Sequence, residues 1–431
     1  MTTATAFIEQ LLAGRDAKPA PDALRALRGE ALEQANRLTV PTTREEDWRF
    51  TDLTPLYRLA FKPAGPSPAV SLESIAAYVT PEAAHRVVFV DGRYAPALSR
   101  SSDEAGVTVT ALSAAAAESL AAVVEPRLGR IAAIDGDAFR AINTAHLGDA
   151  AVVHVRRNAA ASAPVHLLFV TTQAQIATHP RVLIVAETGG EVTVLEDHVA
   201  LADAAYCVNA VTEIDVAANA RVRHIRVQRE TQTAFHIATS KARLAKDARY
   251  DSVAVNLGAR ISRLNLHVQH DGEGAQATVD GLALIAGRQL ADTHSFIDHA
   301  QPHCRTRQLH KTVVGGGAHA VFSGRILVRP GAQLTDSQQQ SRNLLLTGKA
   351  HVDTKPQLEI FADDVKCAHG ATVGQIDPEE VFYLRSRGLG EAAARNLLTY
   401  AFAAEIVGRI PIPSVAAQLR GHALAQTAGK D

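Results

Sequence analysis

The chain has 431 residues, of which 47% are hydrophobic, and its 44 lysines and arginines are balanced by 45 aspartates and glutamates. A chain of this length and composition can bury a large core and is expected to form two or three structural units. Because there is no basic excess to neutralise phosphates, nucleic acid is excluded as an expected partner. No secretory leader or long apolar stretch is found, which predicts a soluble, cytoplasmic protein without membrane contact.

The chain has three cysteines, Cys207, Cys304 and Cys367. An odd number of widely spaced cysteines does not form a disulfide framework in a chain this long. Reduced thiols are therefore expected.

Residues 1–150 are expected to form an N-terminal region of helical and mixed structure. Apolar residues recur there at three to four positions, which gathers them on one helical face: Leu24, Leu27, Ala31, Leu32, Ala35 and Leu38. The segment after Pro41 contains Trp48 and Phe50, which are predicted to anchor it against a larger body.

From 151 to 376 the pattern changes to short runs in which apolar residues alternate. Leu264, Leu266 and Val268 fall at every second position, which places them on one side of a strand. Similar runs follow one another with almost no amphipathic helix between them, which excludes a doubly wound α/β fold. A sandwich, a barrel and a solenoid all remain compatible with this pattern. Strand pairs recur roughly every twenty residues, within the range of solenoid turns.

Residues 377–431 are predicted to form a helical hairpin. Asp377 offers an N-cap, followed by Pro378 at the first helical position. A second helix is expected from about 390 to 407, ended by Gly408 and two prolines. Its apolar stripe can pack on the strands or receive a partner, and it consists of Leu397, Leu398, Phe402 and Ile406.

Two nucleotide-binding patterns are absent. Gly348 and Lys349 resemble the end of a P-loop, but the position five residues before Gly348 is Asn343 and the residue after Lys349 is Ala350. The chain is therefore not expected to hydrolyse ATP. The glycines from 315 to 317 lie among strands and precede no predicted helix, which favours a turn over a dinucleotide-binding loop.

A first group of candidate metal ligands lies between residues 294 and 310. It contains His294, His299, His303, Cys304 and His310. Imidazole and thiolate ligands suit iron and zinc. However, the spacing is looser than in usual structural zinc sites, and strand alternation would send several of these side chains to opposite faces. Histidines satisfied by hydrogen bonds in a β domain are the simpler interpretation.

A second candidate pair is Cys367 and His369. On a strand both would face the same side and reach one bound atom. No third group is evident to orient the histidine for nucleophilic catalysis. A buried thiol beside a hydrogen-bonded histidine, and two ligands offered to a metal, both remain open.

Three segments of the chain resemble one known family. The run HVDTKPQLEIFADDVKCAHGATVGQIDPEEVFYLRSRGLGEAAARNLLTYAF is similar to the carboxyl-terminal signature of the SufB/SufD family, scaffold subunits of the SUF iron–sulfur cluster assembly system. SFIDHAQPHCRTRQLHK and TTREEDWRFTDL extend the resemblance over nearly the whole chain. Within the family the SufD branch is favoured, because SufB tends to carry a glutamate where Gly370 stands, is usually longer and has more cysteines.

This resemblance implies a mainly β fold, with a right-handed parallel β-helix between helical terminal regions. It also implies pairing with SufB through the β-helices and binding of the ATPase SufC through the carboxyl-terminal helices. The position of His369 implies a ligand or ligand-positioning role where a cluster forms between the two scaffold subunits. Cys367 matches a family position too, although it can instead point into the solenoid.

No cofactor is expected to stay bound to the isolated chain, since the iron or iron–sulfur cluster would be transient in the complex. A homodimer of the isolated chain is a further expected association. Two other interpretations remain: a SufB-like paralogue that itself holds the nascent cluster, and a self-contained metal-binding β-helix protein. A polysaccharide-cleaving β-helix is disfavoured because no set of clustered carboxylates is seen.

Overall fold

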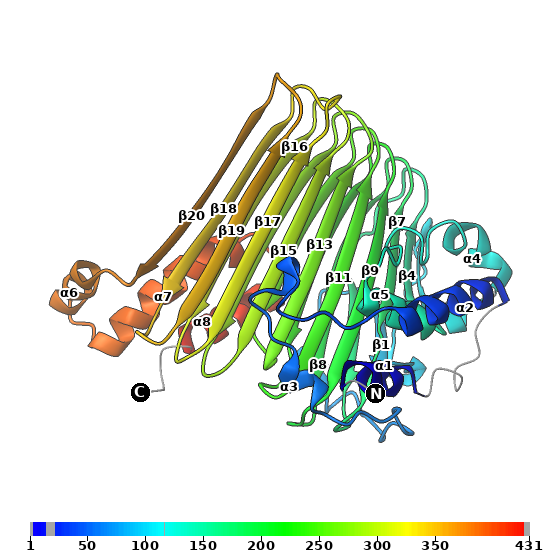
Figure 1. Ribbon diagram of the computed structural model, residues 1–431, viewed down its shortest axis with the longest axis horizontal. Coiled ribbons are helices and arrows are strands. Elements are labelled where there is room, and N and C mark those ends of the chain that lie inside the picture. The colour runs from blue at the N-terminus through cyan, green and yellow to red at the C-terminus, as the bar shows by residue number, and fades with distance from the viewer. Residues whose placement is uncertain (1–2, 14–21, 116, 426–431) are drawn as a thin grey trace.

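In the computed structural model, which describes residues 3–13, 22–115 and 117–425, two long sheets face each other and the chain alternates between them (Figure 1). Successive strands of each sheet pair in parallel over almost their whole length. This arrangement is a parallel β-helix, and the β-helix class implied by the family resemblance is confirmed. The exclusion of a doubly wound fold is confirmed with it.

The first sheet contains ten strands. In spatial order they are β2 (Arg93–Tyr94), β1 (His85–Val90), β5 (Val165–Thr171), β8 (Glu191–Ala200), β10 (Arg221–Arg229), β12 (Arg249–Asn256), β14 (Gln276–Ile285), β16 (Arg305–Val314), β18 (Asp336–Leu345) and β20 (Lys366–Gln375).

The second sheet also contains ten strands. They are β19 (His351–Ile360), β17 (His319–Val328), β15 (Leu290–His299), β13 (Ile261–His270), β11 (Phe235–Leu244), β9 (Cys207–Val216), β7 (Arg181–Ala186), β4 (Ala151–Val155) and β3 (Val107–Ala111), with β6 (Ala177–Thr178) paired to β9.

The register gives the length of one turn. Arg249 pairs with Gln276 and Arg305 pairs with Asp336, so these turns contain 27 and 31 residues. The recurrence of roughly twenty residues expected from the sequence is too short. Strands β11, β15 and β18 lack the apolar alternation of their neighbours, so the repeat could not be measured from the sequence pattern.

The core lies between the two sheets. Leu264, Leu266 and Val268 of β13 are all buried in one cluster with residues of the facing sheet, such as Val222 and Val279. The alternation seen in the sequence therefore marks the inner face of the solenoid, as predicted.

Helical segments close the amino-terminal end. The α-helices there are α1 (Thr3–Leu12), α2 (Asp22–Arg37), α3 (Thr54–Tyr57), α4 (Ala117–Val124) and α5 (Ala138–Ala145). Short 3-10 turns accompany them at Glu46–Trp48, Ala76–Tyr78, Pro96–Leu98 and Leu112–Ala114. Because β1, β2 and β3 join the two sheets, this region also supplies the first strands of the solenoid.

The segment around Trp48 crosses the outer face of the second sheet (Figure 1). Trp48 is buried, and the guanidinium carbon of Arg263 lies 3.8 Å from the centre of its ring. Thr51 donates a hydrogen bond of 2.6 Å to the buried carboxylate of Asp292. The predicted anchoring by Trp48 is confirmed, whereas Phe50 is only half-buried.

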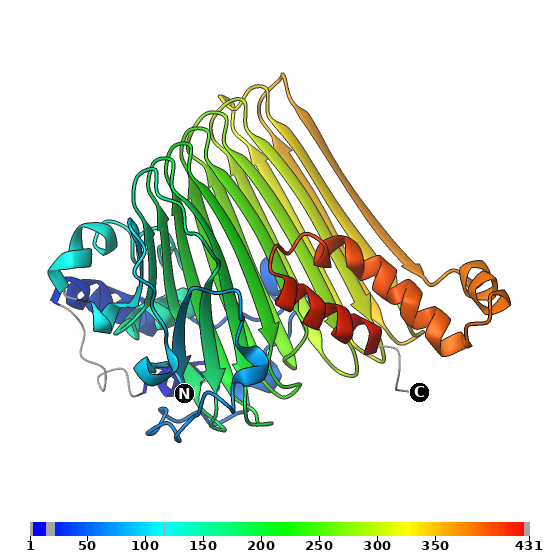
Figure 2. The same ribbon diagram turned by 180° about the vertical axis from the view of Figure 1, so that it is seen from behind.

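Three helices follow the last strand: α6 (Pro378–Ser386), α7 (Glu391–Val407) and α8 (Pro413–Ala425). Helices α7 and α8 lie behind the first sheet in Figure 1 and in front of it in Figure 2. The predicted two-helix hairpin is incomplete, because Pro413 begins a third helix instead of only ending the second. Proline is well tolerated at the first position of a helix.

The glycines from 315 to 317 form the turn between β16 and β17, where Gly316 has a φ of 60°, so the predicted turn is confirmed. Gly348 and Lys349 lie in the turn that leads into strand β19, where a P-loop would lead into a helix. Among the described helices, none combines the length and apolar character that a membrane span needs.

Candidate functional site

The carboxyl-terminal end of the solenoid is formed by the edge strands β19 and β20. Strand β20 pairs only with β18, and this register places Cys367 beside Ser337 and His369 beside Gln339. Ser337 and Gln339 are buried between the sheets. Register partners in a parallel pair face the same side, so Cys367 and His369 face the interior at its open end. There Cys367 is half-buried and His369 is exposed.

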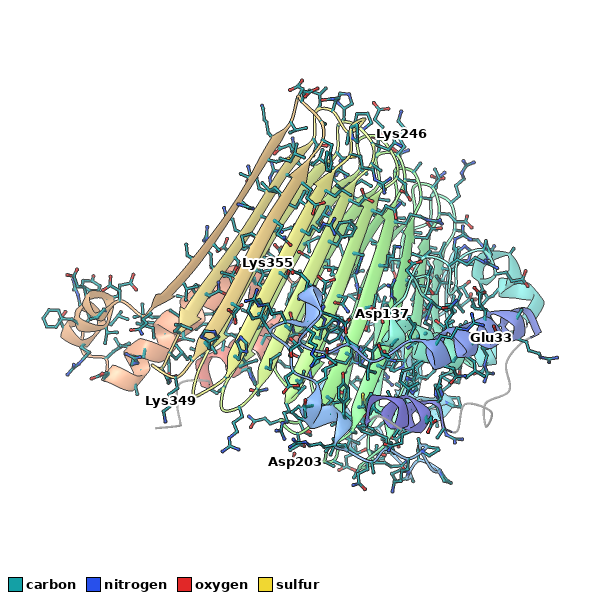
Figure 3. The ribbon with its side chains drawn as sticks, in the orientation of Figure 1. Glu33, Asp137, Asp203, Lys246, Lys349 and Lys355 are labelled. Atoms are coloured by element: carbon teal, nitrogen blue, oxygen red, sulfur yellow. The ribbon has the colours of Figure 1, made fainter. Side chains whose placement is uncertain are left out.

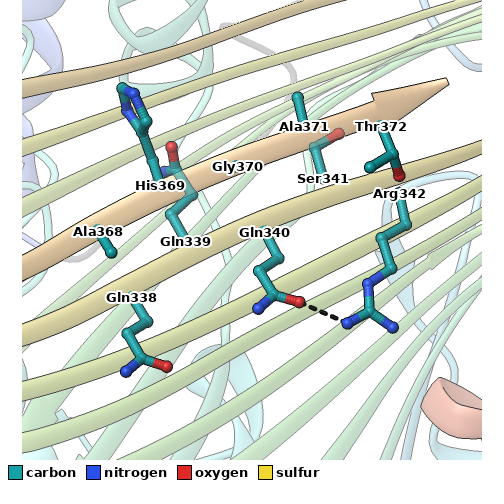
Figure 4. A pocket seen from close by; sticks show the side chains of 10 residues that line it. All are labelled: Gln338, Gln339, Gln340, Ser341, Arg342, Ala368, His369, Gly370, Ala371 and Thr372. Atoms are coloured by element: carbon teal, nitrogen blue, oxygen red, sulfur yellow. Dashed lines mark hydrogen bonds between the residues drawn. The ribbon is translucent and has the colours of Figure 1, made fainter.

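A pocket of about 360 Å³ lies along β18 and β20 and is lined by residues 338–342 and 368–372. Figure 4 shows His369 and Gln339 on one side of the two strands and Gln340 and Arg342 on the other. Arg342 donates a 2.7 Å hydrogen bond to the side-chain oxygen of Gln340. The pocket lining thus includes both faces of the two strands: the His369 imidazole shares one face with the Gln339 amide, and the Arg342 guanidinium shares the other with the Gln340 amide.

Gln339 is the least expected member of this pocket. Among the described residues, neither of its buried amide atoms has a hydrogen-bond partner. A Cβ atom added to Gly324, on the opposite sheet, would lie 2.2 Å from the Gln339 amide nitrogen. Because Gly324 has no side chain, it leaves room for the amide of Gln339. The amide is therefore a polar group placed inside the solenoid, on the strand next to His369.

Cys367 and His369 differ in their readiness to bind a metal. Burial raises the pKa of the Cys367 thiol, and the nearby charge of Asp336 adds to this, although a backbone hydrogen bond from Ser337 opposes both. Cys367 also packs against the apolar interior. Since the thiolate is the metal-binding form, the thiol must lose its proton against this bias, whereas an exposed imidazole can bind directly.

The residues of the group 294–310 do not converge on one point. His294 faces outward, 3.1 Å from Asp292, whereas His299 lies inside, stacked on His270 with 4.3 Å between ring centres. His303 stands in an exposed turn with a φ of 61°. The Cys304 thiol is buried and donates to the Gly272 carbonyl at 3.4 Å. As strand alternation predicted, several of these side chains point to opposite faces of the sheet, so they cannot share one metal ion.

Burial strongly affects the chemistry of these inner groups. It raises the pKa of Cys304 to about 11. It also lowers the pKa of His310 to about 3. It lowers the pKa of His270 to about 4, although hydrogen bonds from the His270 ring to the backbone of Asp298 and Arg305 oppose this. Both imidazoles are therefore neutral near pH 7, and they act as polar packing residues of the solenoid.

Deeper in the solenoid lies a charged network that the sequence reasoning missed. The buried carboxylate of Glu196 accepts hydrogen bonds from Thr212 at 2.8 Å, His198 at 2.8 Å and His224 at 3.0 Å. Burial raises the pKa of Glu196, but the hydrogen bonds from the two histidines outweigh it and hold this pKa well below its usual range. Glu196 and His198 occupy the same alternate positions as the buried Val192 and Val194, which is the signal that could have revealed them.

The apolar stripe of α7 is divided between core and surface. Ile406 is fully buried, while Leu398 and Phe402 pack partly against the same cluster. Lys311 of β16 donates a 2.9 Å hydrogen bond to the Phe402 carbonyl, which fixes the helix on the sheet. Leu397 remains 41% exposed.

Two aromatic residues of α6, Phe382 and Tyr383, are more exposed still, at 72% and 57%. They were not selected from the sequence. In both ribbon views α6 lies at the far end of the helical region, away from the sheets (Figures 1 and 2). Large exposed apolar side chains close together are typical of interaction surfaces.

Comparisons with known proteins agree with this architecture. A family model for the SufBD core domain of SUF system FeS cluster assembly matches residues 169–402, and a model for the SufBD protein N-terminal region matches residues 14–167. The chain is 42% identical to an iron–sulfur cluster assembly SufBD family protein of Synechocystis sp. over 91% of this chain and 89% of that protein.

Two relatives named as the iron–sulfur cluster assembly protein SufD are also similar. The protein of Escherichia coli is 37% identical over 87% of this chain and 86% of its own length. That of Bacillus subtilis is 28% identical, with 93% of each chain covered. The chain therefore belongs to the SufBD family and has a role in SUF iron–sulfur cluster assembly.

Proposed function

We propose that this chain is a non-catalytic scaffold subunit that occupies the SufD position in a complex with SufB and SufC. The similarity to two proteins named SufD supports this position. Iron and the nascent cluster are cargo of the complex, and the isolated chain does not hold a cluster stably. A cytoplasmic location fits the three free cysteines, which a reducing compartment would preserve.

The open end of the solenoid is the proposed contact with SufB. Strands β19 and β20 each pair on one side only, so each leaves a row of backbone donors and acceptors available to another chain. A second β-helix can add to these edges, as strand addition does in other complexes. Without SufB, a second copy of this chain would meet the same edges as a homodimer.

His369 is the residue proposed to act on the cargo. The observation that carries the proposal is its position: it is exposed on edge strand β20, beside the unpartnered amide of Gln339 in an open pocket. A neutral imidazole there can bind iron or position another ligand, while SufB supplies the remaining ligands. Cys367 has a secondary role in this proposal because burial favours its protonated form.

The carboxyl-terminal helices are the proposed contact with SufC, in which we place ATP hydrolysis. Leu397 and the α6 aromatic residues Phe382 and Tyr383 are the exposed apolar residues of α6 and α7 that we assign to this contact. Ile406, Leu398 and Phe402 would support the surface from beneath, because they already pack against the sheet.

The proposed assembly can be tested by co-expressing the chain with SufB and SufC under anaerobic conditions and measuring the subunit ratio of the purified complex. Val373 on β20 and Leu72 in the amino-terminal region are both 48% exposed, so they form a matched pair. Val373→Glu should reduce the recovery of SufB at least tenfold and Leu72→Glu should not. Equal recovery of SufB with both variants would contradict pairing through the β20 edge.

A further inference from the structure

Three potential metal ligands converge on the outer face of the second sheet, and none of them belongs to the two groups predicted from the sequence. His319 of β17 and His351 of β19 are register partners, and Asp353 follows His351 on the same face of β19. One ligand atom from each of the three side chains lies within 4.8 Å of the other two. Among the described residues, this is the one group of three or more such side chains that meets this distance.

Both histidines of this group contact the same carboxylate oxygen of Asp353. The Nε2 atom of His319 lies 2.7 Å from Asp353 Oδ2, and the Nε2 atom of His351 lies 3.2 Å from the same oxygen. The two rings are 5.0 Å apart between centres. Bound Zn²⁺ places nitrogen and oxygen ligands at about 2.0–2.2 Å, so small side-chain rotations would bring all three atoms around one cation.

No protein cation competes for Asp353 among the ion pairs of the described residues, where its partners are the two imidazoles alone. Lys355, the next residue on the same face of β19, pairs with Glu46 of the amino-terminal segment. His351 is exposed, while His319 and Asp353 are half-buried, so the group is open to solvent but partly held by its neighbours.

The group is separate from His369. In Figure 3, Lys349 stands at the lower edge of the sheets, in the turn two residues before His351. Lys355 lies further up, on strand β19. Strand β20 begins at the opposite edge, after the turn that follows β19 (Figure 1). His351 and His369 therefore lie toward opposite ends of the last turn.

We propose that His319, His351 and Asp353 form a binding site for one divalent transition-metal cation, such as Fe²⁺ or Zn²⁺. Two imidazoles and one carboxylate suit these cations, and a three-ligand set leaves coordination positions open for water or an incoming ligand. An open, solvent-facing site of this kind binds an exchangeable cation. The proposal does not depend on the SufD position of the chain, since it needs only these three side chains.

The test uses the full chain without an affinity tag, titrated anaerobically with Co²⁺ while visible absorbance is followed, and with Zn²⁺ in a calorimeter. We expect one equivalent to bind, with an affinity that falls at least tenfold in His351→Ala and in Asp353→Asn. His294→Ala is the matched control, because His294 also faces outward beside an aspartate but, among the described residues, belongs to no group of three converging ligand side chains. His303→Asn is a second control, because His303 stands in an exposed turn outside this group.

Both control variants should bind the metal as the unaltered chain does. Absence of saturable binding in the unaltered chain would overturn the proposal. Binding that persists in His351→Ala and Asp353→Asn, or that either control variant abolishes, would overturn it equally. Circular dichroism of each variant separates a lost ligand from a lost fold.

Discussion

His310 shows how a single interior residue couples the fold to pH. Its ring lies 4.4 Å from that of Phe322, and a Cβ atom added to Gly281 would come within 2.4 Å of its Nδ1 atom. Burial lowers its pKa to about 3, well below the value of about 6.5 expected in the unfolded chain. Between these two pKa values, His310 is therefore protonated in the unfolded chain and neutral in the folded chain.

Acidification therefore destabilises the folded protein through His310. The contribution of neutral His310 to the free energy of unfolding is complete above about pH 6.5 and is lost as the pH falls toward 3. Between pH 7.5 and 5.5 protonation of this one group stabilises the unfolded state by about 1 kcal/mol. In His310→Gln, the loss of stability between these two pH values should be smaller by about that amount.

Urea unfolding at both pH values measures this difference. His303→Asn is the control, because His303 stands in an exposed turn with a positive φ that asparagine tolerates. The control should keep the pH dependence of the unaltered chain. If His310→Gln keeps it too, His310 is not the origin of the effect.

At the scale of elements, helix α7 has one side buried against the first sheet and one side exposed. Leu397 is exposed and Ile406 is fully buried, so substitutions at the two positions should separate binding from folding. Leu397→Glu should weaken SufC binding at least tenfold without changing the thermal transition by more than a few degrees. Ile406→Ala should cost about 2–5 kcal/mol of stability, the usual range for a buried aliphatic residue.

Calorimetry with purified SufC measures the first effect and thermal unfolding the second. Leu424→Glu on α8 provides a control of similar exposure, 38%, and should bind SufC normally. If Leu397→Glu unfolds the protein and causes no selective loss of SufC binding, the apolar stripe of α7 serves only as part of the core.

The elements that could be predicted were those whose inner residues are apolar. In β13 the inner positions are mainly aliphatic, which gives a clear period of two. In β18 the inner positions are Ser337, Gln339, Ser341 and Asn343, so polar residues occupy both faces and the alternation disappears. Helix α8 was missed for a different reason, since Pro413 was interpreted as a stop when it is a helix start.

The candidate sites also differ in how far the sequence could predict them. Cys367 and His369 are two residues apart on one strand, so local geometry was enough to predict a shared side. His319 and His351 are neighbours because the solenoid turn brings them into register. That register depends on the lengths of the turns between strands, which the sequence pattern did not reveal.

At the scale of the whole molecule, we expect the isolated protein to have no ATPase activity and to hold no stable iron–sulfur cluster. The turn at Gly348 and Lys349 leads into a strand, and the edge strand β20 offers one exposed imidazole and one disfavoured thiolate. The purified chain should therefore hydrolyse no ATP above a mock preparation. It should also retain no iron–sulfur absorbance after anaerobic reconstitution and desalting. Turnover that follows the protein through a second purification step would contradict this.

The central claim is that His369 acts on the cargo of an assembled complex. His369→Ala should still assemble with SufB and SufC, because interfaces of this kind commonly bury more than about 1,000 Å² and rest on many residues. Losing a metal ligand or its orienting group typically costs about 10–100-fold in metal affinity or activity. Cys367→Ser should matter less and appear mainly as a modest change in stability, since this thiol packs against the apolar interior.

The most direct measurement is anaerobic reconstitution of iron and sulfide on the purified complexes, followed by the charge-transfer absorbance per complex. The account predicts normal subunit ratios for both variants, a cluster yield at least tenfold lower with His369→Ala, and a yield near that of the unaltered complex with Cys367→Ser. A normal cluster yield in an intact complex that carries His369→Ala would contradict the account.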